Sequence, residues 1–207
     1  MVQTFLTSSD FVESARSLDD KRLGKERVEA YQILCLIEDL TFLSGHLHLP
    51  VPPSRDKLRE WIRRIARDYK KKSYRFVVKD GTYQCVNDTN LRSLKSQWNK
   101  DGYRVVSLGF VYHPIVQMWF GYSDALKLYI NAHIQVWIER GYKNNMKTYS
   151  VPDNPPRPPW TYDPKVHLSH RAALLHKEIT RHEKPWYQLK TDFLNAGPFT
   201  DYIWVLD

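Results

Sequence analysis

The sequence lacks the marks of a secreted, membrane-spanning or metal-binding protein. Only two cysteines occur among the 207 residues, and Cys35 and Cys85 show neither a metal-ligand spacing nor a disulfide framework. We expect both to be buried, reduced thiols. No run of about 18 apolar residues is available to cross a membrane, and no basic segment leads into an apolar stretch as in a secretory signal. These absences favour a soluble, intracellular protein.

The motifs of nucleotide-binding and repeat proteins are absent as well. The chain contains no glycine-rich phosphate loop, no internal repeat and no low-complexity tract. Apolar residues nevertheless make up 42% of the sequence, which suffices at this length for one domain with an elaboration. Helical periodicity dominates, and it predicts a mainly α-helical body that carries an inserted basic α+β segment.

Positive charge is concentrated in one quarter of the chain. Residues 51–105 contain 15 Lys and Arg against 6 Asp and Glu, whereas the other 152 residues contain 16 against 17. Within this quarter, apolar residues and cations alternate at helical spacing, which predicts an amphipathic helix with a cationic outer face. We expect four cations of this face to contact the phosphates of a nucleic acid: Arg59, Arg63, Arg64 and Arg67.

Two other roles remain open for the cationic helix. It could lie on an anionic membrane, or it could be a solvated surface helix without a partner. The interleaved Trp and Tyr residues and the absence of a lipidation motif favour nucleic acid over a membrane.

Asp-Gly pairs predict tight turns beyond the cationic helix. Asp80-Gly81 stands between two strand-like stretches, because this pair supplies the positive φ angles of a hairpin turn. A short helix and the pair Asp101-Gly102 then lead to one more strand. The predicted boundaries are 51–108 for the basic insertion, and 1–49 with 109–207 for the helical body.

A long helix is predicted over residues 22–40 in the N-terminal part. Ile33, Leu36 and Leu40 form its apolar stripe, and charged residues stand at the head of the same face. A carboxylate held among cations at the end of a buried stripe suits the mouth of a pocket. An exposed helix start with an i,i+4 ion pair is the simpler alternative.

The second half is also predicted to be helical. Pro114 fits a first helical position, and a buried stripe over residues 126–137, which includes His133, ends at Gly141. The proline-rich residues 150–164 predict a stiff crossing segment that Trp160 anchors. A last helix is predicted to begin near Ser169.

Four stretches of this chain resemble a known family: "LGKERVEAYQIL", "HPIVQMWFGYSDALKLYINAHIQVWIERGY", "HLSHRAALLHKE" and "KPWYQLK". They are similar to the pyrimidine-dimer DNA glycosylase and AP lyase family of the endonuclease V type, over residues 1–49 and 110–195. The resemblance implies a compact all-helical fold that kinks double-stranded DNA and flips a base. It also implies a monomer that needs no cofactor, metal or obligate protein partner.

The resemblance implies that the N-terminal amine attacks the sugar of the damaged nucleotide. Val2 carries this amine if Met1 is removed. An α-amine with a pKa of about 7.7–8.0 is far more often unprotonated near neutral pH than a Lys with a pKa of about 10.4. The amine of Met1, or Lys21 or Lys25 with a lowered pKa, are the alternatives.

A glutamate preceded by an arginine assists in this family. Arg27 and Glu29 are the best counterparts here, although they are one residue further apart than the usual pair, and Glu26 is the second candidate. Such a carboxylate stabilises the cationic sugar and then moves protons during strand cleavage, so it must lie close to the amine. We therefore expect substitution of Glu29 to have the larger effect.

Phosphate and base contacts would complete the site. Cations near the carboxylate are expected to hold phosphates on either side of the target nucleotide, and aromatic residues to stack on bases. The candidates for DNA contact in the body are Arg22, Lys25, Arg27, His170, Arg171, Trp186 and Tyr187.

Two other functional classes compete with this hypothesis. Four histidines, His167, His170, His176 and His182, could serve a metal-dependent nuclease, but no carboxylate-rich ligand set accompanies them. A non-catalytic nucleic-acid-binding protein on the same scaffold is the other alternative, because the β-branched Val2 and the displaced Glu29 depart from the family pattern.

Overall fold

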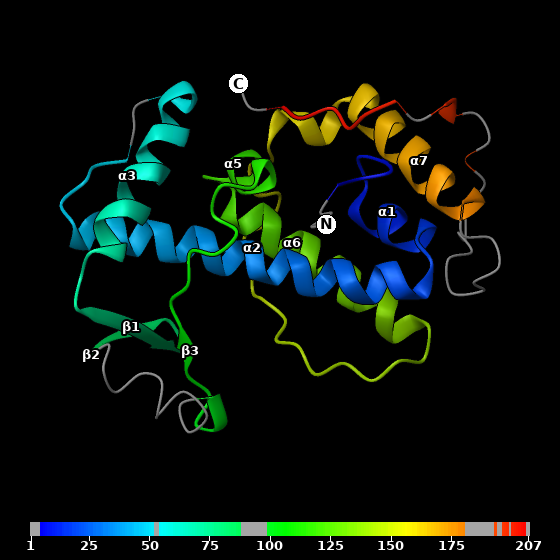
Figure 1. Ribbon diagram of the computed structural model, residues 1–207. Helices are drawn as coiled ribbons and strands as arrows, with labels where there is room; N and C mark the ends of the chain where they lie inside the picture. The colour runs from blue at the N-terminus through cyan, green and yellow to red at the C-terminus, as the bar shows by residue number, and fades with distance from the viewer. Residues whose placement is uncertain are drawn as a thin grey trace. The chain divides into compact units, whose positions relative to one another are not determined.

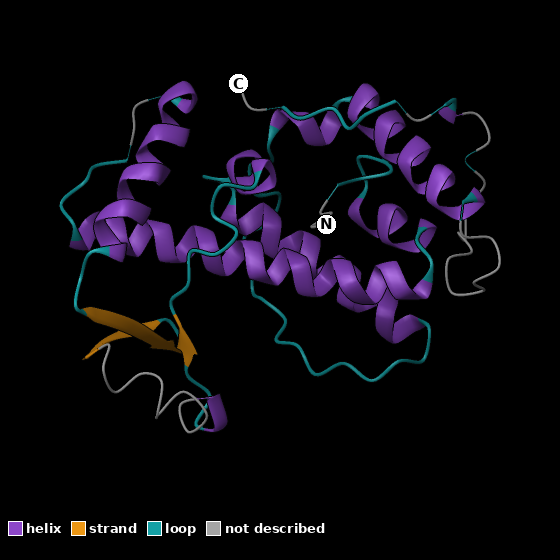
Figure 2. Ribbon diagram, viewed as in Figure 1, coloured by secondary structure: helices purple, strands orange, loops and turns teal. Residues whose placement is uncertain are grey.

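The computed structural model describes residues 5–51, 54–87, 99–180, 193, 196–198 and 200–205. These residues form six α-helices, two short 3₁₀ helices and one three-stranded antiparallel sheet (Figure 2). The mainly α-helical class predicted from the sequence is therefore confirmed. The chain divides into two compact units, Met1–Ile37 with Pro114–Asp207, and Glu38–His113.

The described residues of the first unit form helices and loops, without a strand (Figure 1). It contains α1 (Phe11–Ser17), the first part of α2 (Asp20–His46), α5 (Pro114–Trp119), α6 (Ser123–Glu139), a 3₁₀ helix (Pro159–Tyr162) and α7 (Pro164–Ile179). One buried cluster joins Ala15 of α1, Leu23 of α2, Val136 of α6 and Leu174 of α7. Burial of Leu23, Val136 and Leu174 stabilises the fold by roughly 1.5–3 kcal/mol for each side chain.

Side-chain hydrogen bonds fix the two N-terminal helix starts. Asp10 caps α1 by accepting from the backbone N–H groups of Val12 and Glu13, each at 2.8 Å. Asp19 does the same for α2, because its Oδ1 accepts from the N–H of Arg22 at 2.8 Å. Arg140 of α6 then donates to Asp20 at 2.7 Å. These contacts set the position of α2 in the first unit.

The second unit contains the basic helix and the sheet. Its elements are the last part of α2, a 3₁₀ helix (Arg55–Lys57), α3 (Leu58–Lys70), β1 (Tyr74–Lys79), β2 (Thr82–Asn87) and β3 (Arg104–Val105), with strand order β2-β1-β3. Asp80 and Gly81 have φ angles of 49° and 80°, so the predicted tight hairpin turn is confirmed. Asp39 accepts two hydrogen bonds from Arg104 of β3, with N···O distances of 2.6 and 2.8 Å.

Most helix boundaries agree with the predictions from periodicity. α2 contains the whole of residues 22–40, α5 begins at Pro114, and the stripe of α6 is buried up to Val136. α7 begins at Pro164, and the predicted start near Ser169 was wrong. The cause is local, because Asp163 accepts from the N–H of Lys165 at 2.8 Å and caps the helix one turn earlier.

Two predicted burials also need correction. Cys35 is buried, but Cys85, in the edge strand β2, is exposed. Trp137 is half-buried, not fully buried as the stripe predicted. Its ring is covered by the Arg27 guanidinium, 4.2 Å from the ring centroid, and by the ring of Tyr142 at 4.2 Å. In the described residues, no helix is long and apolar enough to cross a membrane.

Gly24 of α2 is required by the close approach of Trp137. A Cβ at this position would lie 2.9 Å from Cζ3 of the indole ring, which Arg27 and Tyr142 hold in place. We expect Gly24→Ala to lower the free energy of unfolding by about 1–2 kcal/mol, because overpacking outweighs the gain in helix propensity of about 1 kcal/mol. Urea unfolding measures the change.

Gly45 provides the matched control in the same helix. No described heavy atom lies within 4 Å of a Cβ built there. Gly45→Ala should therefore raise the free energy of unfolding by up to about 1 kcal/mol. Equal effects of the two substitutions would show that the Trp137 contact does not limit position 24.

Candidate active site

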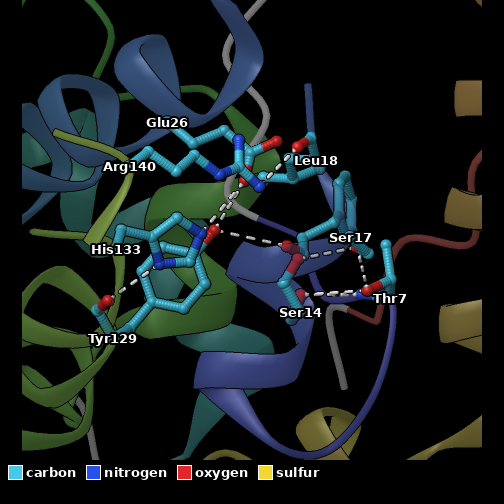
Figure 3. Close-up of polar contacts among 9 residues, drawn as sticks. Thr7, Ser14, Ser17, Leu18, Glu26, Tyr129, His133 and Arg140 are labelled. Carbon is cyan, nitrogen blue, oxygen red and sulfur yellow. Dashed lines mark hydrogen bonds and ion pairs between the residues drawn. The ribbon is translucent and has the colours of Figure 1, made fainter. Parts of the chain in front are cut away.

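A buried carboxylate on α2 meets two polar side chains of α6. Tyr129 and His133 are four residues apart, so they lie on the same face of α6, toward Glu26. The Tyr129 hydroxyl donates to Glu26 Oε2 at 2.8 Å, and His133 Nε2 lies 3.5 Å from the same oxygen. Figure 3 shows both side chains directed at the carboxylate. All three are buried, with 2% exposure for Glu26.

The surroundings of Glu26 favour its protonated form. Burial raises the pKa of its carboxyl group, while contacts with His133 and Tyr129 oppose this rise, and the negative charge of Glu29 adds to it. His133 Nδ1 lies 2.9 Å from the carbonyl oxygen of Tyr129. A carbonyl can only accept, so Nδ1 carries a proton, and in neutral imidazole Nε2 is then an acceptor facing Glu26. A proton on Glu26 suits this tautomer.

The second oxygen of this carboxylate, Oε1, differs from Oε2 in its contacts within the described part of the chain. Glu26 Oε1 is buried and has no hydrogen-bond partner among the residues that the structure describes. Buried polar atoms are nearly always paired, so an unpaired carboxylate oxygen points to a role other than packing.

The N-terminal segment is bound to this carboxylate cluster. The Tyr129 hydroxyl lies 3.3 Å from the carbonyl oxygen of Phe5 as well as bonding to Glu26. The Thr7 N–H donates to Ser14 Oγ at 2.9 Å, and its carbonyl accepts from Arg171 Nε at 2.6 Å. Figure 3 shows Thr7, Ser14 and the Glu26 cluster in one view. Residues 5–7 are therefore fixed a few residues after the N-terminus.

Aromatic rings surround Phe5. Its ring stacks on Tyr202 at 5.4 Å and 3°, and it contacts Trp204 at 5.1 Å and His170 at 5.5 Å. Burial raises the pKa of Tyr202 to about 12. These rings bury Phe5, whose carbonyl oxygen lies beside the Tyr129 hydroxyl.

Glu29 lies one turn further along α2 than Glu26. Its carboxylate is mostly buried, with 10% exposure, and forms an ion pair with the exposed Lys25 at 3.2 Å. The structure thus brings both candidate carboxylates to one stretch of α2, one in the interior and one paired near the surface. Lys25, a candidate for phosphate contact, lies on the exposed side.

The other predicted cations of the body already have protein partners. Arg22 is buried and donates to Asp19 at 2.6 Å. Arg27 is half-buried, covers Trp137, and donates to Asn144 Oδ1 at 3.2 Å. Arg171 binds the carbonyl of Thr7. The geometry gives these side chains structural roles, and their contact with DNA stays a prediction.

The histidines do not form a metal site in the described residues. His167 Nε2 bonds to the Thr161 carbonyl at 3.0 Å. His170 is fully buried against Phe5, and burial lowers its pKa to about 3, so it is neutral. His176 is exposed, and His182 lies outside the described residues.

Three further predictions lie outside the described residues: the nucleophile Val2 and the stacking candidates Trp186 and Tyr187. Tyr129 and Phe5 were not predicted as site residues, and His133 was predicted only as part of a buried stripe. The sequence did contain a signal for this site, namely a histidine and a tyrosine in an apolar stripe. Their polar atoms, once buried, require hydrogen-bond partners on another element.

The comparison with known families finds one matching family model. The family model described as pyrimidine dimer DNA glycosylase matches residues 2–150, which is 149 of 207 residues. The matched range contains Phe5, Glu26, Glu29, Tyr129 and His133, and it ends before α7. No curated relative and no solved structure matches the chain. The chain therefore belongs to the pyrimidine dimer DNA glycosylase family, whose activity requires that it bind DNA.

Proposed function

We propose that this DNA glycosylase also has AP lyase activity, and that it excises a damaged or modified pyrimidine from double-stranded DNA through a Schiff base on its N-terminal amine. One observation carries the proposal: the carbonyl of Phe5 and the carboxylate of Glu26 lie within reach of the same Tyr129 hydroxyl. Val2 is three residues before Phe5, so its amine lies at most about 10 Å further along the chain. An amine and an acid can thus meet at one nucleotide.

The reaction needs both a nucleophile and proton transfer. The amine attacks C1′ of the sugar, and the glycosidic bond breaks with its electron pair leaving on the base, which takes a proton. The C1′–O4′ bond then opens as O4′ is protonated, which leaves an imine between the enzyme and C1′. Loss of a proton from C2′ expels the 3′ phosphate, and water releases the amine.

The two carboxylates suit different steps of this reaction. Burial raises the pKa of Glu26, which favours a group that donates a proton to O4′. Glu29, which forms an ion pair with the exposed Lys25 near the surface, suits the cationic sugar. The sequence spacing from Arg27 favours Glu29 as the main acid. The buried contacts of Glu26 with Tyr129 and His133 favour Glu26 instead, and we assign the role of proton donor to Glu26.

Borohydride trapping tests the lyase class. A duplex with one abasic site is incubated with the protein and reduced, because reduction converts an imine into a stable amine. We expect a covalent adduct whose yield does not change with a chelator. Chelator-sensitive cleavage without an adduct would indicate a metal nuclease, and binding without either product would indicate a non-catalytic protein.

A further inference from the structure

The exposed face of α3 carries a row of cations. Arg59, Arg63 and Arg67 are spaced by four residues and Lys70 follows, so all four share one side of the helix, and all are exposed. The row is about 16 Å long at a rise of 1.5 Å per residue. From Arg55 to Arg75 the chain has ten Lys and Arg against three Asp and Glu.

This row is not neutralised within the described protein. Arg59 and Arg63 have no ion-pair partner among the described residues. The exposed Arg67 has only its neighbour, the half-buried Asp68, at 3.4 Å. Like charges at i and i+4 destabilise a helix by about 0.2–0.5 kcal/mol per pair. A polyanion bound along the row would attract these cations and offset their mutual repulsion.

The buried face of α3 argues against a membrane surface. An interfacial helix needs a free apolar face to enter the lipid. Here Leu58, Ile62 and Ile65 are buried inside the second unit, with exposures of 3%, 1% and 0%. The exposed face of α3 therefore offers charged side chains and no large apolar ones. Such a face fits the phosphates of a nucleic acid.

We propose that the α3 face, defined by Arg59, Arg63, Arg67 and Lys70, binds the phosphate backbone of duplex DNA at a surface separate from the Glu26 cluster. One duplex strand carries a phosphate every 3.4 Å along the axis, so the row is long enough to follow about five of them. Binding of this kind reads no base and holds damaged and intact DNA equally. The inference rests on the DNA binding of the family and does not depend on the amine chemistry.

The test measures the affinity for an intact duplex of about 20 base pairs at several salt concentrations. Arg59→Gln, Arg63→Gln and Arg67→Gln are combined in one variant. The slope of log affinity against log salt should fall by up to about 0.9 per lost contact, which corresponds to a loss of up to about a hundredfold near 0.15 M salt. A duplex with an abasic site should show the same loss.

Two controls isolate the charge of this face. Replacement of the same three residues by Lys keeps the charge and should keep the slope. Replacement of Lys143, Lys147 and Lys165, which are exposed in the first unit, by Gln changes the net charge equally and should leave the slope nearly unchanged.

An unchanged slope in the Gln variant, with a native circular dichroism spectrum, would overturn the inference. So would an equal fall in the Lys143, Lys147 and Lys165 control, because the effect would then be one of net charge. The wild-type protein could give no borohydride adduct while the Gln variant still shows a smaller slope of log affinity against log salt. That result would refute the proposed function and support DNA binding by the α3 face.

Discussion

Glu26→Gln is expected to lower the rate of strand cleavage at an abasic site by at least about a hundredfold, which is the effect of removing a positioned acid. Glutamine keeps the shape of the side chain, and its amide oxygen can still accept from the Tyr129 hydroxyl at the position of Oε2. That oxygen carries no proton, so the variant keeps the Tyr129 contact and loses the proton donor next to His133 Nε2. Single-turnover cleavage with saturating DNA measures the chemical step separately from binding.

The pH profile gives a second readout for the same variant. A proton donor with a raised pKa loses its proton as pH rises through that pKa, so wild-type cleavage should decline there. This decline should be absent from the residual activity of Glu26→Gln. A decline that persists unchanged would assign the titrating group to another residue.

The raised pKa of Glu26 also predicts how the stability of Glu26→Gln compares with that of the wild type as pH changes. The folded-state pKa of Glu26 is raised, so ionisation of the carboxyl group destabilises the folded state as pH rises from about 4.5 through the folded pKa. Glutamine does not ionise. The variant should therefore become more stable relative to the wild type over this range, and a thermal melt at each pH shows whether a loss of activity is a loss of fold.

Glu29→Gln is the matched comparison on the same helix. Under our assignment it weakens stabilisation of the cationic sugar and has the smaller effect on ring opening. If Glu29→Gln instead causes the larger loss of cleavage and Glu26→Gln a small one, the order expected from sequence spacing is correct and our assignment of the proton donor is wrong.

Periodicity and turn chemistry predicted most of the fold because their causes are local. The apolar spacing of Ile33, Leu36 and Leu40 requires one buried face of a helix, and Asp80-Gly81 requires a tight turn. Both are confirmed. The start of α7 was missed although the signal was present, since Asp163 and Pro164 form a cap and a first helical position.

The site was less predictable because it depends on contacts between distant segments. Spacing on α2 selected Glu26 and Glu29 but could not rank them, since the difference lies in what α6 places opposite each one. Phe5, Glu26 and Tyr129 are far apart in sequence and meet at one hydroxyl group. A periodic pattern reports that a face is buried, but not which side chains it meets.

The surroundings of the cationic residues also could not be predicted from helical spacing. Arg22 and Arg59 look alike in sequence, as cations on predicted helices. In the structure Arg22 is buried and bound to Asp19, whereas Arg59 is exposed without an ion-pair partner among the described residues. Helical spacing predicts which cations share a face, and only the fold decides whether that face meets protein or solvent.

Blocking the N-terminal amine is expected to abolish the borohydride adduct and to lower strand cleavage by at least about two hundredfold. This factor is the advantage of an α-amine over an ordinary lysine in the fraction of free base near pH 7.4. The comparison uses a protein with about ten extra N-terminal residues, before and after a specific protease removes them and exposes the amine of Val2. Both forms keep residues 5–7, which Tyr129 and Arg171 hold, so the difference reports the amine and its distance from Glu26. An extended protein that cleaves as fast as the trimmed one, with its adduct mapped by mass spectrometry to the peptide of Lys21 or Lys25, would overturn the terminal amine as nucleophile and retain the lyase class.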